Sequence, residues 1–297
     1  MSHAEDGPQP VIIRKKWHSR WNRFRIRRHV AAAARAPQTP NPAFERFRRE
    51  LRGTFPQAGG RGVIVAACND HYYRDFALTM LRSIERHGQT ECLHLHLCDP
   101  SPETEAHVRR LAAALTHVRL TWTADDGSLA RTLRYPTIYF AAARFLVAPL
   151  ILASARAPIL CLDIDGIAMQ PIWQAYESVR GVGDVVLIKR PEEPDPERKI
   201  LASAVGVEFS EAGQRFADAL ANATAACLAM RPRYHVDQIV IHYLSERLEQ
   251  DGSLTTAPMP KSLADFDFGE DAAIWTAKGW HRKNSEAYAS ATKAVEA

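Results

Sequence analysis

Short apolar runs alternate with segments of helical spacing over residues 62–165. GVIVAAC at 62–68 and LHLHLCD at 93–99 have the length and apolar content of buried strands. Between them, Phe76, Met80 and Ile84 recur every four residues, as on one face of a helix. The pattern predicts strands at 62–68, 93–99, 118–124 and 158–165, separated by helices at 70–87, 100–115 and 138–152.

This alternation predicts an α/β fold with a mixed, mainly parallel sheet and helices on both of its faces. Further strands are expected at 184–190 and 201–209, and helices at 211–229 and 234–249. The last dozen residues lack an apolar pattern, so we expect a loose C-terminal tail over 286–297. Residues 61–285 then form the main domain.

The first 60 residues differ in character from the rest. They hold 13 Lys and Arg against 4 Asp and Glu, whereas the remaining 237 residues hold 25 against 30. Aromatic and basic residues interleave over 17–36 and 44–53, which we interpret as two helices of a basic N-terminal extension. It is either a solvated or docking segment or, through residues 14–52, a contact to an anionic membrane surface. Nucleic-acid binding is not expected, because the basic residues do not continue into the main domain.

The cysteines indicate a reducing compartment. There are five of them, none in a CxxC pair, and several lie in apolar runs. The N-terminal residues lack the apolar core of a signal peptide, and the longest apolar stretch, 137–153, contains Arg144 and Pro149. We therefore expect a cytoplasmic location, with a membrane-peripheral one as the alternative.

Two aspartates follow the strand in ILCLDIDGIA, residues 159–168. Carboxylates two residues apart on an extended chain project to the same side, so Asp163 and Asp165 can reach one hard cation. Mn²⁺ or Mg²⁺ held in this way keeps free positions for diphosphate oxygens. The plain alternative is an exposed strand end with two solvated acids.

The same DIDG also matches the first motif of haloacid dehalogenase phosphatases, in which the first aspartate is a phosphoryl-accepting nucleophile. That family continues with Thr or Val, where this chain has Ile167. The motif normally opens the core domain, but about 100 residues of strands and helices precede it here. The acidic pair Asp125–Asp126 comes too early to complete that family's Mg²⁺ site, so we keep the phosphatase as the lesser alternative.

Residues 62–285 resemble nucleotide-sugar glycosyltransferases of the GT-A fold, particularly those like family 8. Six segments carry the resemblance in the expected order: VIVAACNDHYYRDFALTMLRSIERH, YPTIYFAAARFLVAPLIL, PILCLDIDGIAMQPI, LASAVGVEFSEAGQRF, VDQIVIHYL and WTAKGWHRKN. The resemblance implies a UDP-sugar or similar donor, and a glycan, lipid-linked or protein acceptor. A catalytically silent domain that binds nucleotide sugar or glycan is the second alternative.

The resemblance also assigns residues by position. For the donor nucleotide sugar it implies Ala66, Ala67, Cys68, Asn69, Tyr72, Arg144, Asp163, Ile164, Asp165, Lys278 and Gly279. Arg144 lies in an apolar helix, so we expect it to pair with the two aspartates or with the nucleotide sugar. For Mn²⁺ or Mg²⁺ the implied ligands are Asp163, Asp165 and His281, although the family's histidine comes earlier in its closing loop.

On the acceptor side the resemblance implies Asp237 and Gln238 as catalytic residues. In an inverting enzyme Asp237 would be the general base, and in a retaining enzyme either residue would steady the donor sugar. Three more residues are expected to line the same cleft: Arg190, Ser203 and His235.

Overall fold

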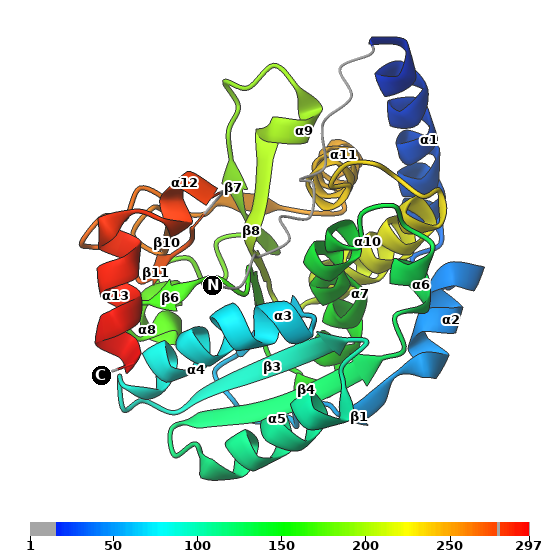
Figure 1. Cartoon of the computed structure of the whole chain (residues 1–297). Coiled ribbons are helices and arrows are strands. Elements are labelled where there is room, and N and C mark those ends of the chain that lie inside the picture. Colours follow the sequence, from blue (N-terminus) through cyan, green and yellow to red (C-terminus); the bar gives the residue numbers. More distant parts are fainter. Residues whose placement is uncertain (1–15, 278–279, 297) are drawn as a thin grey trace.

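A mixed eight-stranded sheet runs through the molecule in the order β1-β4-β3-β2-β5-β8-β7-β9 (Figure 1). The computed structural model describes residues 16–277 and 280–296. The strands of this sheet are β1 (Arg52–Thr54), β2 (Val63–Cys68), β3 (Glu91–Cys98), β4 (Val118–Asp125), β5 (Ile159–Leu162), β7 (Val185–Lys189), β8 (Ile200–Val207) and β9 (Thr256–Pro258).

The direction of the strands sets where a ligand site can form. β4, β3, β2 and β5 are parallel, and β8 is antiparallel to both β5 and β7. The carboxyl ends of β2 and β5 therefore meet the first half of β8 at one edge of the sheet. Ligands of open α/β sheets gather at such carboxyl ends. The mainly parallel sheet predicted from the sequence is confirmed.

Helices cover both faces of this sheet, as predicted, and each face has its own apolar core. One face packs on α7 (Thr137–Ala155), α10 (Glu211–Ala229) and α11 (Asp237–Gln250). The other packs on α4 (Leu78–Glu85), α5 (Pro102–Ala114) and α8 (Ile172–Tyr176). Among the described residues α7 alone is long and apolar enough to span a membrane, but 72% of its apolar 18-residue window is buried, as in the core helix of a folded domain.

The helix expected at 70–87 is interrupted directly after β2. It consists of α3 (Asp70–Tyr72), a π-helical turn η1 (Tyr73–Ala77) and then α4. Short π-helical turns are frequent at functional sites. The turn lies where the resemblance places the nucleotide. Two further short helices are α6 (Ser128–Arg131) and α9 (Pro196–Lys199).

A second, three-stranded sheet joins the segment after the two aspartates to the C-terminal region. Its order is β10 (Ala264–Asp265), β11 (Ile274–Trp275), β6 (Ile167–Ala168), and α12 (Trp280–Lys283) and α13 (Glu286–Glu296) follow it. The expected loose tail over 286–297 is wrong, since α13 fills Glu286–Glu296. Tyr288 on α13 is 5% exposed and packs with Ile167 and Ala277. The apolar positions of α13 are few and lie among small and polar residues, so the hydrophobic pattern of the sequence did not predict this helix.

The N-terminal extension shares the core of the main domain. α1 (Lys16–Arg35) lies against α10 and α11 (Figure 1), and α2 (Pro42–Glu50) lies against α10. Ile26 of α1 and Phe47 of α2 are fully buried in the same core as α7. Asn41 caps α2, and its side-chain NH₂ donates to the carbonyl oxygen of Asn222 on α10. These helices are therefore an integral part of the fold.

We predict that Phe47→Ala lowers the free energy of unfolding by about 3–5 kcal/mol, because Phe47 is 1% exposed and its loss leaves a cavity. The matched control is Phe24→Ala on α1, whose ring is 52% exposed and whose removal is expected to change stability by less than about 0.5 kcal/mol. Urea denaturation of both variants measures the difference. Equal, small effects would contradict an integral extension.

Candidate functional site

A buried arginine lies at the carboxyl edge of the sheet. Arg144 comes from the middle of α7, and its side chain is 3% exposed. One guanidinium nitrogen, Nη1, lies 2.8 Å from Oδ1 of Asp163, and Nη2 donates to the carbonyl oxygen of Ala202 on β8 at 2.8 Å. A charge this deep needs partners, and these two supply them.

Asp163 lies just beyond β5. Its backbone N–H donates to the carbonyl oxygen of Ser203 on β8 at 2.9 Å, and its own carbonyl accepts from the N–H of Gly166 at 3.2 Å. Its side chain is 36% exposed, so one side faces Arg144 while another remains open to a ligand. The pairing of Arg144 with this aspartate is present, as expected from the sequence.

Arg144 also reaches the helix expected on the acceptor side. Its Nη2 lies 3.9 Å from Oδ2 of Asp237, the first residue of α11. Asp237 is 4% exposed, and its Oδ1 accepts the backbone N–H of Gln238 at 2.9 Å. A helix N-terminus and a neighbouring guanidinium both stabilise a carboxylate placed between them. Arg144 thus joins Asp163 and Asp237, the aspartates expected on the donor and acceptor sides.

Asp165 has a separate cation partner. Its Oδ2 lies 2.7 Å from Nζ of Lys283 on α12, and both side chains are largely buried. The hydroxyl of Tyr288 donates to the backbone oxygen of Asp165 at 2.7 Å. Burial raises the pKa of the Asp165 carboxyl, and the ammonium of Lys283 opposes that shift.

The residues expected at the nucleotide lie at the same edge. Ala66, Ala67 and Cys68 are buried at the end of β2, and the side chain of Asn69 accepts the N–H of Tyr72 to cap α3. Lys283, which pairs with Asp165, also lies near Tyr72: its Nζ is 5.6 Å from the centre of the Tyr72 ring. Ile164, between the aspartates, is 9% exposed.

The expected acceptor residues are only partly brought together. Ser203 of β8 lies beside Asp163, since its carbonyl oxygen accepts the backbone N–H of Asp163. The Oγ of Ser203 is buried without a hydrogen-bond partner among the described residues. His235 is half-buried, two residues before Asp237. Arg190 instead pairs with Glu193 in the segment between β7 and β8, and the described residues show no contact from it to the aspartates. Lys278 and Gly279 lie outside the described residues, as does the side chain of His281.

The described residues at this edge fit a divalent metal poorly as they are arranged. Carboxylate oxygens are the ligands Mn²⁺ and Mg²⁺ prefer. However, Asp163 and Asp165 each have an oxygen within 2.8 Å of a cationic nitrogen, from Arg144 and Lys283 respectively. An ion on Oδ2 of Asp165 would first need Lys283 to leave.

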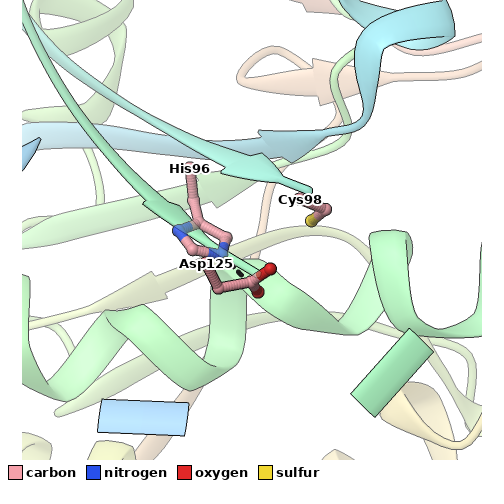
Figure 2. A group of neighbouring side chains, drawn as sticks. All are labelled: His96, Cys98 and Asp125. Atoms are coloured by element: carbon pink, nitrogen blue, oxygen red, sulfur yellow. Dashed lines mark hydrogen bonds and ion pairs between the residues drawn. The ribbon is translucent and has the colours of Figure 1, made fainter. Parts of the chain in front are cut away.

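A second group with metal-ligand chemistry lies inside the sheet, at the ends of β3 and β4 (Figure 2). Ligand atoms of His96, Cys98 and Asp125 lie within 4.8 Å of one another. Both ring nitrogens of His96 already have partners, Thr123 and Asp125. Burial, with the Asp125 charge, raises the pKa of the Cys98 thiol well above its usual value. We interpret this fully buried group as a structural polar network.

Surface hollows lie away from this edge. One of them, with a volume of about 570 Å³, is lined by Arg61, Gln89, Thr90, Gln174 and Glu177. Arg61 and Thr90 precede β2 and β3, so the hollow lies at the amino ends of the parallel strands, opposite the aspartates. The convergent charges, and not the hollow, mark the candidate site.

Sequence reasoning missed Lys283 and Tyr288 at this site. Lys283 lies in WTAKGWHRKN, a segment already assigned to the site, but Lys278 and His281 were chosen from it. The basic run offers no signal for which of its members turns inward. Tyr288 lay in the segment interpreted as a tail.

We predict that Arg144→Met lowers the free energy of unfolding by about 3–5 kcal/mol, because it leaves the buried Asp237 without its charge partner. Adding Asp237→Asn removes that unpaired charge and should recover part of the loss. The control is Arg131→Met, an exposed arginine paired with Asp126, for which a change below about 1 kcal/mol is expected. Urea denaturation measures all three. Wild-type stability of Arg144→Met would contradict the buried network.

Comparison with known proteins identifies solved structures that share the fold of this chain. No protein-family model and no curated protein matches the sequence. Among solved structures, the galactosyltransferase LgtC, in complex with donor and acceptor sugar analogues, gives a TM-score of 0.54 at 13% identity, covering 78% of this chain and 95% of that one. An active-site mutant of LgtC gives a TM-score of 0.53 at 12% identity, covering 79% of this chain and 95% of that one.

The glycosyltransferase GlyE of Streptococcus pneumoniae TIGR4 gives a TM-score of 0.50 at 14% identity, covering 78% of this chain and 57% of that one. The chain likewise spans only 52% of the bifunctional glycosyltransferase WbbM. At these identities the likeness establishes the fold alone. This chain has the fold of the GT-A glycosyltransferases.

Proposed function

We propose that this protein is a glycosyltransferase that moves a sugar from a nucleotide diphosphate donor, first of all a UDP-sugar, to a glycan, lipid-linked or protein acceptor. One observation carries the proposal. The buried guanidinium of Arg144 joins Asp163, where the donor is expected, to Asp237, where the acceptor side is expected. The GT-A fold and the glycosyltransferases that share it support the same reaction class.

In this reaction the bond between the sugar's anomeric carbon and the diphosphate breaks. The oxygen of the acceptor hydroxyl bonds to that carbon, and its proton passes to a phosphate oxygen of the leaving group or to water. The diphosphate leaves with additional negative charge, so a cation beside it lowers the barrier. The sequence resemblance implies Mn²⁺ or Mg²⁺ at Asp163 and Asp165 for this purpose. The positive charge there comes either from such an ion or from Lys283 of the chain itself.

Asp237 is better suited to positioning than to proton abstraction. It is 4% exposed, one of its oxygens accepts a backbone N–H, and the other faces Arg144. A general base needs to reach the acceptor hydroxyl directly or through one water. The burial therefore favours a role in which Asp237 holds Arg144 in place while the half-buried Gln238 steadies the donor sugar, as in a retaining enzyme.

The proposal predicts UDP release from one member of a panel of UDP-sugars, increased by a suitable acceptor. Asp163→Asn should lower the rate at least about tenfold, because Arg144 loses its charged partner at the donor. Asp251→Asn, at the exposed end of α11, is the control and should retain the wild-type rate. Coupled detection of UDP measures all three proteins.

Each alternative gives a different result in this assay. Tight UDP binding with no turnover on any donor and acceptor would identify a silent binding domain. Phosphate release from simple phosphomonoesters, with an aspartyl-phosphate at Asp163, would identify a phosphatase. Either result would contradict the proposal.

We also propose that the protein contacts anionic membranes through one face of α1. Trp21 and Phe24 are 58% and 52% exposed, and their rings stack at 5.8 Å. Arg20 and Arg28 are exposed on the same helix, while Ile26 on the opposite side is buried in the core. Aromatic residues beside arginines suit the interface of an anionic bilayer. The aromatic residues of α2 are buried and cannot enter a bilayer. The membrane contact expected somewhere within residues 14–52 is therefore assigned to α1 alone.

We predict that the protein co-sediments with vesicles of phosphatidylglycerol and phosphatidylcholine, and less so as salt increases. Trp21→Ala with Phe24→Ala should lower the bound fraction several-fold, because the inserted rings are lost. Phe209→Ala removes an exposed ring elsewhere and should have no effect. Binding that is unchanged by the double substitution would contradict the assignment of this surface.

A further inference from the structure

A cation of the protein lies against Asp165, where the sequence resemblance places a metal. Nζ of Lys283 is 2.7 Å from Oδ2 of Asp165, and the two side chains are only 18% and 14% exposed. The ammonium also lies 4.3 Å from the centre of the Phe76 ring and 5.6 Å from that of Tyr72. A surface ion pair is a weak interaction, but this one is enclosed by a carboxylate and two aromatic rings.

The chain holds Lys283 in this place from both sides. The neighbouring Arg282 pairs with Asp267 at 2.9 Å and lies over the ring of Phe266. On α13, the hydroxyl of Tyr288 donates to the backbone oxygen of Asp165 itself. Lys283 is therefore positioned by anchors on either side of it in the sequence and does not depend on its own flexible side chain alone.

Each of the two aspartates already has a cationic partner from the chain, although Arg144 also faces Asp237. Asp163 pairs with Arg144, and Asp165 pairs with Lys283. A divalent ion bound to Oδ2 of Asp165, which lies 2.7 Å from Nζ of Lys283, would be within about 5 Å of the ammonium, given metal–oxygen distances of about 2 Å. Two cations so close in a largely buried site repel each other strongly. Asp165 therefore accommodates either Lys283 or a metal ion.

We propose that the ammonium of Lys283, and not a divalent ion, supplies the positive charge beside the donor diphosphate, so that donor binding needs no Mn²⁺ or Mg²⁺. This inference rests on the proposed function. An ammonium has three N–H donors, of which Asp165 takes one, so others remain for phosphate oxygens. Charge-assisted hydrogen bonds of this kind are the strong ones, and an aspartate that is paired with a cation repels the diphosphate less than an unpaired one.

Calorimetric titration of the full chain with UDP, in EDTA and in millimolar MnCl₂, tests the inference. The wild type should bind UDP with less than about a twofold difference between the two conditions. Lys283→Met should bind about tenfold more weakly or worse in EDTA, since it loses a charge-assisted hydrogen bond. Lys293→Met, an exposed lysine on α13, is the matched control and should bind as the wild type does. UDP binding by the wild type that EDTA abolishes would overturn the inference.

A second measurement needs no donor. Electron paramagnetic resonance of MnCl₂ with the protein, with and without UDP, should show no stoichiometric Mn²⁺ on the wild type. Lys283→Ala should take up Mn²⁺ at the freed Asp165, and adding Asp165→Asn should abolish that uptake. Stoichiometric Mn²⁺ on the wild type, lost in Asp165→Asn, would overturn the inference. Failure to bind UDP under every condition would contradict the proposed function, while the Mn²⁺ measurement still decides what occupies Asp165.

Discussion

The buried guanidinium of Arg144 is the constraint on which the site depends. A cation that is 3% exposed inside an apolar helix is stable only with partners, and Asp163, Asp237 and the Ala202 carbonyl are those partners. They come from the end of β5, the start of α11 and from β8. Because all three groups must approach one guanidinium, β5, α11 and β8 are held in fixed positions relative to one another at the carboxyl edge of the sheet.

The second cation links this edge to the C-terminal region. Lys283 pairs with Asp165, and Tyr288 of α13 bonds to the same residue, so the last helices hold the turn that carries both aspartates. β6, directly after that turn, pairs with β11 from the C-terminal region. The site is thus assembled from segments more than about 100 residues apart, and the C-terminal helix is part of its support.

The sequence predicts the inner strands of the sheet because strands buried on both faces are continuous apolar runs, such as GVIVAAC and ILCL. It does not predict the edge strands β1 and β9, which are only three residues long. It also predicts a partner for Arg144, since an arginine within IYFAAARFLVAPLIL has no water to solvate it. The π-helical turn at Tyr73–Ala77 has no comparable signal, because its apolar spacing reads as an ordinary helix. Lys283 could not be predicted, because only the path of the chain decides which member of a basic run turns inward.

The most direct test of this account is a crystal structure of the protein with UDP and MnCl₂, with anomalous data collected at the manganese absorption edge. The account predicts a diphosphate within hydrogen-bonding distance of Nζ of Lys283, with Arg144 on Asp163 and no anomalous peak at Asp165. A manganese peak on Asp165, with Lys283 displaced from it, would contradict the assignment of the cation. A UDP bound far from both aspartates would contradict the site itself.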